Sequence, residues 1–240
     1  MFGAATMKNL FVLCIFTALF VLPAFGQQGS ADVFSPEGAH PKARALMKED
    51  FFWSPIDESG PFGSDDGSDA AHGFYNWRKG NRSISPIDYL TDLIKSWNYP
   101  PIAWGELDTN KLKAYVGGSV KPDAATIEAT VQALKQQQAE YAAKSGNAKI
   151  LTDEQLRQIA MNGGNGMGLT FLVGLDESII GVAFAQIVIE GRIDPKLKYY
   201  VQRALQREML QVITRQFGRA DQQKAHEDKM RKMLFVVNHI

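Results

Sequence analysis

The chain of 240 residues has one cysteine, no net charge and no apolar run long enough to cross a membrane. Cys14 lies in an N-terminal segment that we expect to be removed, so disulfides, thiol catalysis and a Cys-based zinc site are excluded from the mature protein. The 26 basic and 26 acidic residues leave no basic excess. Nucleic acid and anionic membrane are therefore poor candidates as partners.

The first 26 residues have the pattern of a secretory signal peptide. Lys8 precedes the apolar run 10–22, which is about 13 residues long and shorter than the ~20 that a spanning helix needs. Ala24 and Gly26 place small residues at the two positions that a signal peptidase reads. We predict cleavage after Gly26, no transmembrane segment in the mature chain, and a secreted or periplasmic location.

The rest of the chain predicts a mainly α fold. Residues 27–40 are polar and predict a flexible leader, and 41–240 predict a single helical domain, arranged as a bundle or an irregular solenoid with at most a short strand pair. The one candidate strand is 169–173. Apolar spacing and capping residues predict helices over 41–50, 69–79, 86 to the prolines at 100 and 101, 123–145, 153–161, 176–190, 195–217 and 221–237.

The helix expected over 176–190 is apolar almost all round, which predicts that it is the central core helix. Asp176 is expected to cap its N-terminus. The glycine-rich segment 162–168 has neither the spacing nor the preceding strand of a phosphate-binding loop, so a helix end and a turn are the better interpretation.

The densest group of functional side chains is the acidic loop 53–69. It holds five carboxylates among glycines and prolines: Asp57, Glu58, Asp65, Asp66 and Asp69. Oxygen ligands on a bent backbone suit calcium, and paired carboxylates suit hydrolysis. The spacing of an EF-hand is absent, however, and Asp and Ser also cap helices and form turns. The four histidines show no metal-ligand spacing, so no metal ligand and no cofactor is predicted, with calcium as the open alternative.

Two segments resemble one known group of proteins. The stretch from His40-Pro41 through Phe51-Phe52-Trp53-Ser54-Pro55 to the acidic loop, and the later Ala183-Phe184-Ala185-Gln186 with Glu190-Gly191-Arg192-Ile193-Asp194, are similar to uncharacterised bacterial proteins of the YfeS/MolR type. The similarity covers about residues 40–98 and 176–208. It implies one helical domain and implies no catalytic residue.

The sequence predicts an exported protein that binds an unknown protein or small ligand without catalysing a reaction, through the acidic loop 53–69. The alternative is a metal-dependent or carboxylate-based hydrolase with its site in the same loop, so the question of an enzyme stays open. In either case the candidate residues are the five carboxylates named above.

Overall fold

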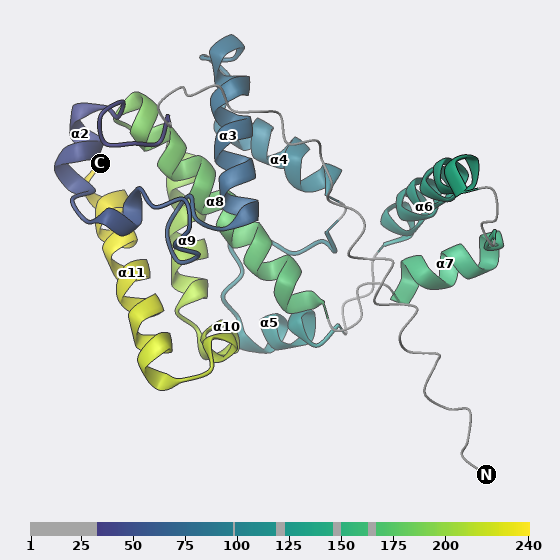
Figure 1. The fold of residues 1–240 in the computed structure, drawn as a ribbon. Coiled ribbons are helices and arrows are strands. Elements are labelled where there is room, and N and C mark those ends of the chain that lie inside the picture. The colour runs from purple at the N-terminus through teal and green to yellow at the C-terminus, as the bar shows by residue number, and fades with distance from the viewer. Residues whose placement is uncertain (1–32, 98, 119–122, 146–149, 163–166) are drawn as a thin grey trace. The chain divides into compact units, whose positions relative to one another are not determined.

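The most apolar helix among the described residues, α8 (Gly168–Glu190), is the centre of the fold in the computed structural model (Figure 1). Val182, Phe184 and Ile187 are all fully buried, as the sequence predicts. Helix α8 is also the one helix in the described part of the chain that is long and apolar enough to cross a membrane, and 83% of that apolar window is buried inside the domain. Its hydrophobic surface is therefore used in packing the core.

The structure describes residues 33–97, 99–118, 123–145, 150–162 and 167–240. Within these residues there are ten α-helices and no strand, which confirms the mainly α class. Helices α3, α4, α5, α9 and α2 all contact α8, and α11 packs against α9. The other α-helices are α2 (Pro41–Leu46), α3 (Asp65–Gly80), α4 (Pro86–Ser96), α5 (Thr109–Val116), α6 (Ala124–Ser145), α7 (Asp153–Asn162), α9 (Pro195–Glu208), α10 (Gln211–Thr214) and α11 (Ala220–His239).

Several helix boundaries follow the sequence closely. Ser85 caps α4 by accepting a hydrogen bond from the N–H of Ile87 at 3.3 Å, and Pro86 takes the first helical position. Thr152 and Gln155 form the expected capping box of α7, with bonds of 2.9 and 3.3 Å. Gly191 ends α8 with φ of +62°, and a Cβ there would lie 2.0 Å from His40 Nδ1, so only glycine fits.

The start of α8 corrects two predictions. The segment 169–173 is helical and not a strand, and Asp176 lies inside the helix and caps nothing. The reason is tertiary packing. Leu172 is buried in a cluster with Leu112 of α5, Tyr115 of α5 and Ile213 of α10, which holds this apolar stretch as another turn of helix.

Other boundaries also differ from the prediction. Helix α3 begins at Asp65 and not at 69, because Ser64 is the cap: its Oγ accepts from the N–H of Gly67 at 3.2 Å. Helix α9 ends at Glu208, where the longer helix was expected to continue to 217. Helix α2 ends at Leu46, and a 3-10 turn over Asp50–Phe52 follows it.

The helical unit starts earlier than predicted, at Phe34. Phe34 is buried and stacks on Phe62 with ring centroids 4.4 Å apart, and the N–H of His40 donates to the carbonyl of Val188 at 2.8 Å. Phe34 and His40, which were expected to be part of a flexible leader, are therefore held against the core. The predicted signal peptide lies outside the described residues.

Helices α6 and α7 form a hairpin with a small core of their own. Val131, Leu156 and Ala160 are its buried residues. Gln138 joins the two helices by accepting from the N–H of Leu151 at 2.6 Å. The exposed Arg157–Glu128 ion pair, at 2.8 Å, adds little stability because both side chains are in water.

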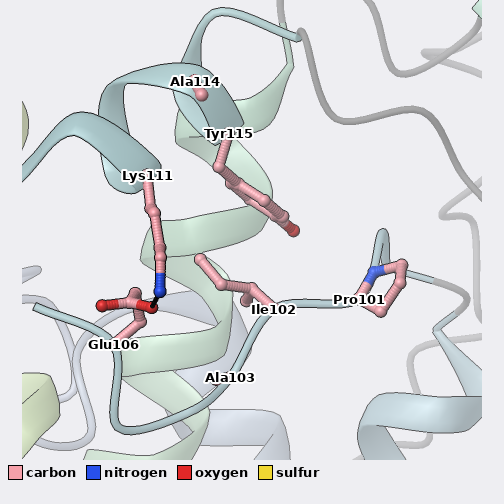
Figure 2. Close-up of a pocket in the computed structure, with 7 residues that line it drawn as sticks. All are labelled: Pro101, Ile102, Ala103, Glu106, Lys111, Ala114 and Tyr115. Atoms are coloured by element: carbon pink, nitrogen blue, oxygen red, sulfur yellow. Dashed lines mark hydrogen bonds and ion pairs between the residues drawn. The ribbon is translucent and has the colours of Figure 1, made fainter. Parts of the chain in front are cut away.

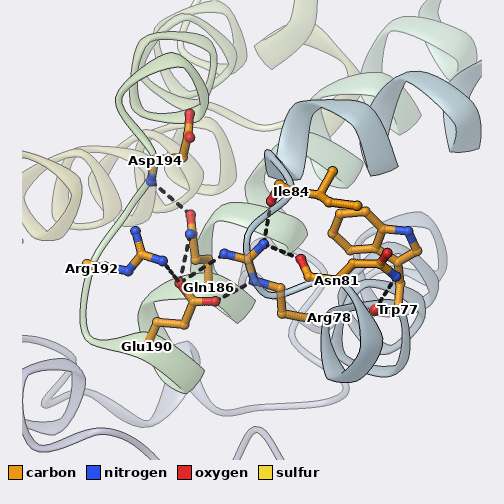
Figure 3. Close-up of polar contacts among 8 residues, drawn as sticks. All are labelled: Trp77, Arg78, Asn81, Ile84, Gln186, Glu190, Arg192 and Asp194. Carbon is orange, nitrogen blue, oxygen red and sulfur yellow. Dashed lines mark hydrogen bonds and ion pairs between the residues drawn. The ribbon is translucent and has the colours of Figure 1, made fainter.

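A buried arginine fastens α3 to the end of α8 (Figure 3). Arg78 Nε donates to Glu190 Oε1 at 2.5 Å, and its Nη1 donates to the carbonyls of Asn81 and Ile84. Gln186 continues the network by accepting from the N–H of Asp194, where α9 begins. Arg78 is thus already paired, and it does not neutralise the carboxylates of the acidic loop.

Candidate functional site

A hollow of about 350 Å³ lies between the acidic loop, the first turn of α3 and the middle of α8. The loop contributes Glu58, Gly63 and Ser64, helix α3 contributes Asp65 and Asp66, and α8 contributes Glu177. Four of these six residues are acids and none is basic. The hollow is therefore suited to a positively charged group.

Two close approaches between helices shape the hollow. Gly181 of α8 faces the backbone of Gly67 in α3, and a Cβ on Gly181 would come within 2.3 Å of the Gly67 carbonyl oxygen. Gly174 leaves space for the carboxylate of Asp66, which a Cβ there would meet at 2.1 Å. These glycines bring the N-terminus of α3 against α8, so that Asp66 and Glu177 share one hollow.

The two inner carboxyls of the hollow are hard to ionise. Burial, followed by the charges of Glu208 and Asp66, raises the pKa of Glu177 to about 8. Burial also raises the pKa of Asp66, although the hydroxyl of Tyr99 opposes this by donating to Oδ2 at 3.2 Å. At neutral pH the Glu177 carboxyl is thus mostly protonated. A cation in the hollow would favour its ionised form.

Behind the hollow lies a fully buried ion pair. The guanidinium of Arg207 in α9 donates to both carboxylate oxygens of Asp176, and its Nη1 donates to the carbonyls of Trp104 and Glu106. Burial raises the pKa of Asp176 to about 7, with the Arg207 charge opposing that rise. This pair fixes α9, α8 and the segment before α5 together. It leaves no spare charge to neutralise Glu177.

The structure places the five predicted residues differently. Glu58, Asp65 and Asp66 line the hollow. Asp57 does not line it, because its carboxylate is paired with Lys229 of α11 at 2.6 Å and accepts from the N–H of Ser59 at 3.1 Å. Asp69 is exposed on α3 and is not among the lining residues. The acidic loop thus divides into residues that line the hollow and residues that do not.

Sequence reasoning missed Glu177. The signal was present, because Asp176 and Glu177 form an acidic pair within a long apolar helix, and such a pair must be buried or must face a site. The interpretation of Asp176 as a helix cap removed that signal. No spacing in the sequence indicated that Glu177 would meet Asp65 and Asp66, more than a hundred positions earlier in the chain.

A second hollow, of about 270 Å³, lies beside α5 (Figure 2). Its walls include Pro101, Ile102 and Tyr115, and its charged residues, Glu106 and Lys111, already form an ion pair at 2.9 Å. It offers no unpaired charge for chemistry. Among the residues that the structure describes, no group of three or more His, Cys, Asp and Glu side chains is arranged to hold a metal ion.

Comparison with known proteins gives no match: neither the scan of family models nor the searches of curated proteins and of solved structures returns a relative of this chain. The resemblance to YfeS/MolR-type proteins stays a prediction. The function of this protein is therefore inferred from the geometry of the site.

Proposed function

We propose that the chain is an exported protein whose acidic hollow binds, without catalysing a reaction there, a positively charged group, an ammonium or a guanidinium, from a protein partner or a small ligand. One observation carries the proposal: Glu58, Asp65, Asp66 and Glu177 line one hollow in which no basic side chain takes part. The signal-like N-terminus supports a partner that is met outside the cytoplasm.

The charges of the hollow favour an organic cation over a bare metal ion. The carboxylates line a volume of about 350 Å³ and do not form a described metal-binding group. An ammonium or guanidinium fits within such a volume and donates several hydrogen bonds to separate carboxylates. We expect no nucleic acid at this surface, because its phosphates and the carboxylates are both negative.

Isothermal titration with a tetra-arginine peptide, and with a tetra-glutamate peptide as the negative control, tests the proposal. Only the arginine peptide should bind, and higher salt should weaken it. Asp65→Asn and Asp66→Asn should each weaken binding about fivefold, which is about 1 kcal/mol. Asp88→Asn is the matched control, because Asp88 lies in the first turn of α4, away from the hollow. An equal loss in the control would contradict the proposal.

The hydrolase alternative stays a prediction that the described geometry does not test. A metal-dependent form of it has a separate test, since an ion that binds only the folded state must raise the melting temperature. Calcium should then stabilise the wild type, and the double change of Asp66 and Asp69 should remove that effect. We expect calcium to leave the melting temperature unchanged.

A further inference from the structure

A serine, a histidine and a glutamate lie next to one another in space, on the side of the acidic loop that faces α11. Ser59 Oγ is 3.0 Å from His226 Nδ1, and His226 Nε2 is 3.2 Å from Glu208 Oε2. The three residues come from the loop, from α11 and from the end of α9. His226 is 5% exposed and Glu208 is 3% exposed. The fold therefore brings together residues that are 167 positions apart.

The Glu208 carboxyl lies beside Nε2 of the His226 ring, and the Ser59 hydroxyl lies beside Nδ1. A proton on Nε2 leaves Nδ1 as the acceptor. The hydroxyl of Ser59 then donates to Nδ1. A nucleophile that donates to a base, with a carboxylate next to the base, is the arrangement that activates a serine.

Two buried atoms of this relay have no hydrogen-bond partner among the described residues. They are His226 Nε2 and Glu208 Oε1. The 3.2 Å approach of Nε2 to Glu208 is an ion-pair distance without the direction of a hydrogen bond. Buried polar atoms are rarely left unpaired, and catalytic hydrogen bonds are often misaligned before a substrate is bound.

The loop holds Ser59 at the tip of a tight turn. Asp57 accepts from the N–H of Ser59 through its side chain and from the N–H of Gly60, at 2.7 Å, through its carbonyl. Lys229 fixes the Asp57 carboxylate from α11. A Cβ on Gly60 would lie 2.4 Å from the carbonyl oxygen of Phe51, so the turn needs glycine. Ser59 itself remains partly exposed.

We propose that Ser59 is a nucleophile for acyl transfer, with His226 as its base and Glu208 as the residue that positions the imidazole. The substrate class is an ester. The Ser59 oxygen bonds to the acyl carbon, His226 takes the hydroxyl proton, and the alkoxide leaves with that proton. Water then releases the acid from Ser59 through the same base, so that ester and water give acid and alcohol. This activity uses none of the residues that line the acidic hollow.

Labelling of the full chain with a fluorophosphonate, followed by peptide mass spectrometry, tests the proposal. A phosphorus–oxygen bond should form at Ser59 while fluoride leaves with the proton. Ser68 is the matched serine, because it also lies beside a histidine, but its Oγ is 3.5 Å from His72 Nδ1. That nitrogen is 3.0 Å from the carbonyl oxygen of Ser68 and donates to it, so it does not accept from the hydroxyl. Ser68 should stay unlabelled.

Variants separate catalysis from folding. His226→Gln should slow the labelling of Ser59 about 100-fold or more. Glu208→Gln should slow the labelling of Ser59, and Glu208→Asp, which keeps a carboxylate beside the imidazole, should restore part of the rate. A structural role alone would not link the labelling rate to the carboxylate. Lys229→Gln, which loosens the same turn but keeps the relay, should label within a few-fold of the wild type.

A wild-type chain that is not labelled at Ser59, or is labelled there no faster than at Ser68, overturns the proposal. The relay would then be a tether between the loop and α11. This comparison needs no variant, so it decides the question even where His226→Gln does not fold.

Discussion

The buried carboxyl of Glu177 should make the protein less stable as pH rises. Its pKa is about 8 in the folded protein, against 4.5 for the ordinary group. Between these values the folded state holds a proton that the unfolded state has lost. The contribution of the Glu177 carboxyl to the free energy of unfolding is therefore complete below about pH 4.5 and is lost as pH rises through 8. The loss is up to about 1.4 kcal/mol per pH unit.

Glu177→Gln isolates this effect, because the amide has nearly the shape of the protonated carboxyl and cannot ionise. From pH 6 to pH 8 the wild type should lose up to about 2.5 kcal/mol more free energy of unfolding than the variant. The buried carboxyl of Asp176 adds a fall of the same sign in both proteins. Urea unfolding at pH 6, 7 and 8 measures both slopes.

Glu58→Gln is the control for this experiment. Glu58 lines the same hollow but is exposed, so its replacement should leave the wild-type slope in place. Equal slopes for the wild type and Glu177→Gln would refute the reasoning. They would show that the Glu177 carboxyl is ionised in the folded protein, with water or a cation beside it.

Three further predictions concern the core and the N-terminus. Phe184→Ala should cost about 3–5 kcal/mol in urea unfolding, whereas Phe235→Ala, at a side chain that is 54% exposed, should cost less than about 0.5 kcal/mol; similar costs would place α8 outside the core. Arg207→Leu should lower the free energy of unfolding by about 3–5 kcal/mol, because it leaves Asp176 buried and unpaired. Adding Asp176→Leu to the same chain should recover much of that loss. A double variant as unstable as Arg207→Leu would contradict this explanation. Mass spectrometry of the exported protein should find Gln27 at the N-terminus, and an intact N-terminus would exclude cleavage there.

Local sequence signals predicted much of the fold. Ser85 with Pro86, Thr152 with Gln155, and Gly191 each fix a helix end through contacts within a few residues, and the structure has those ends. The strand predicted over 169–173 was wrong because a distant contact decides there: this segment is helical, and Leu172 packs on α5 and α10.

The candidate site shows the same division. Three carboxylates of the hollow belong to one acidic stretch, and the sequence indicated them directly. Glu177 and the Ser59–His226–Glu208 relay depend on how α3, α9 and α11 pack, and the spacing of these residues along the chain carries no information about that packing. Nor could the sequence show that Asp57, unlike its neighbour Glu58, would be paired with Lys229.

The release of protons on binding is the sharpest test of the acidic hollow as a cation site. A cationic group that enters the hollow beside Glu177 favours the ionised carboxyl, so at pH 7 we predict that binding releases close to one proton per ligand. Calorimetric titration with the tetra-arginine peptide in two buffers of different ionisation enthalpy measures that number. We predict a release near one for the wild type and near zero for Glu177→Gln. Binding without proton release, or the same release from both proteins, would contradict the assignment of the acidic hollow as the cation site.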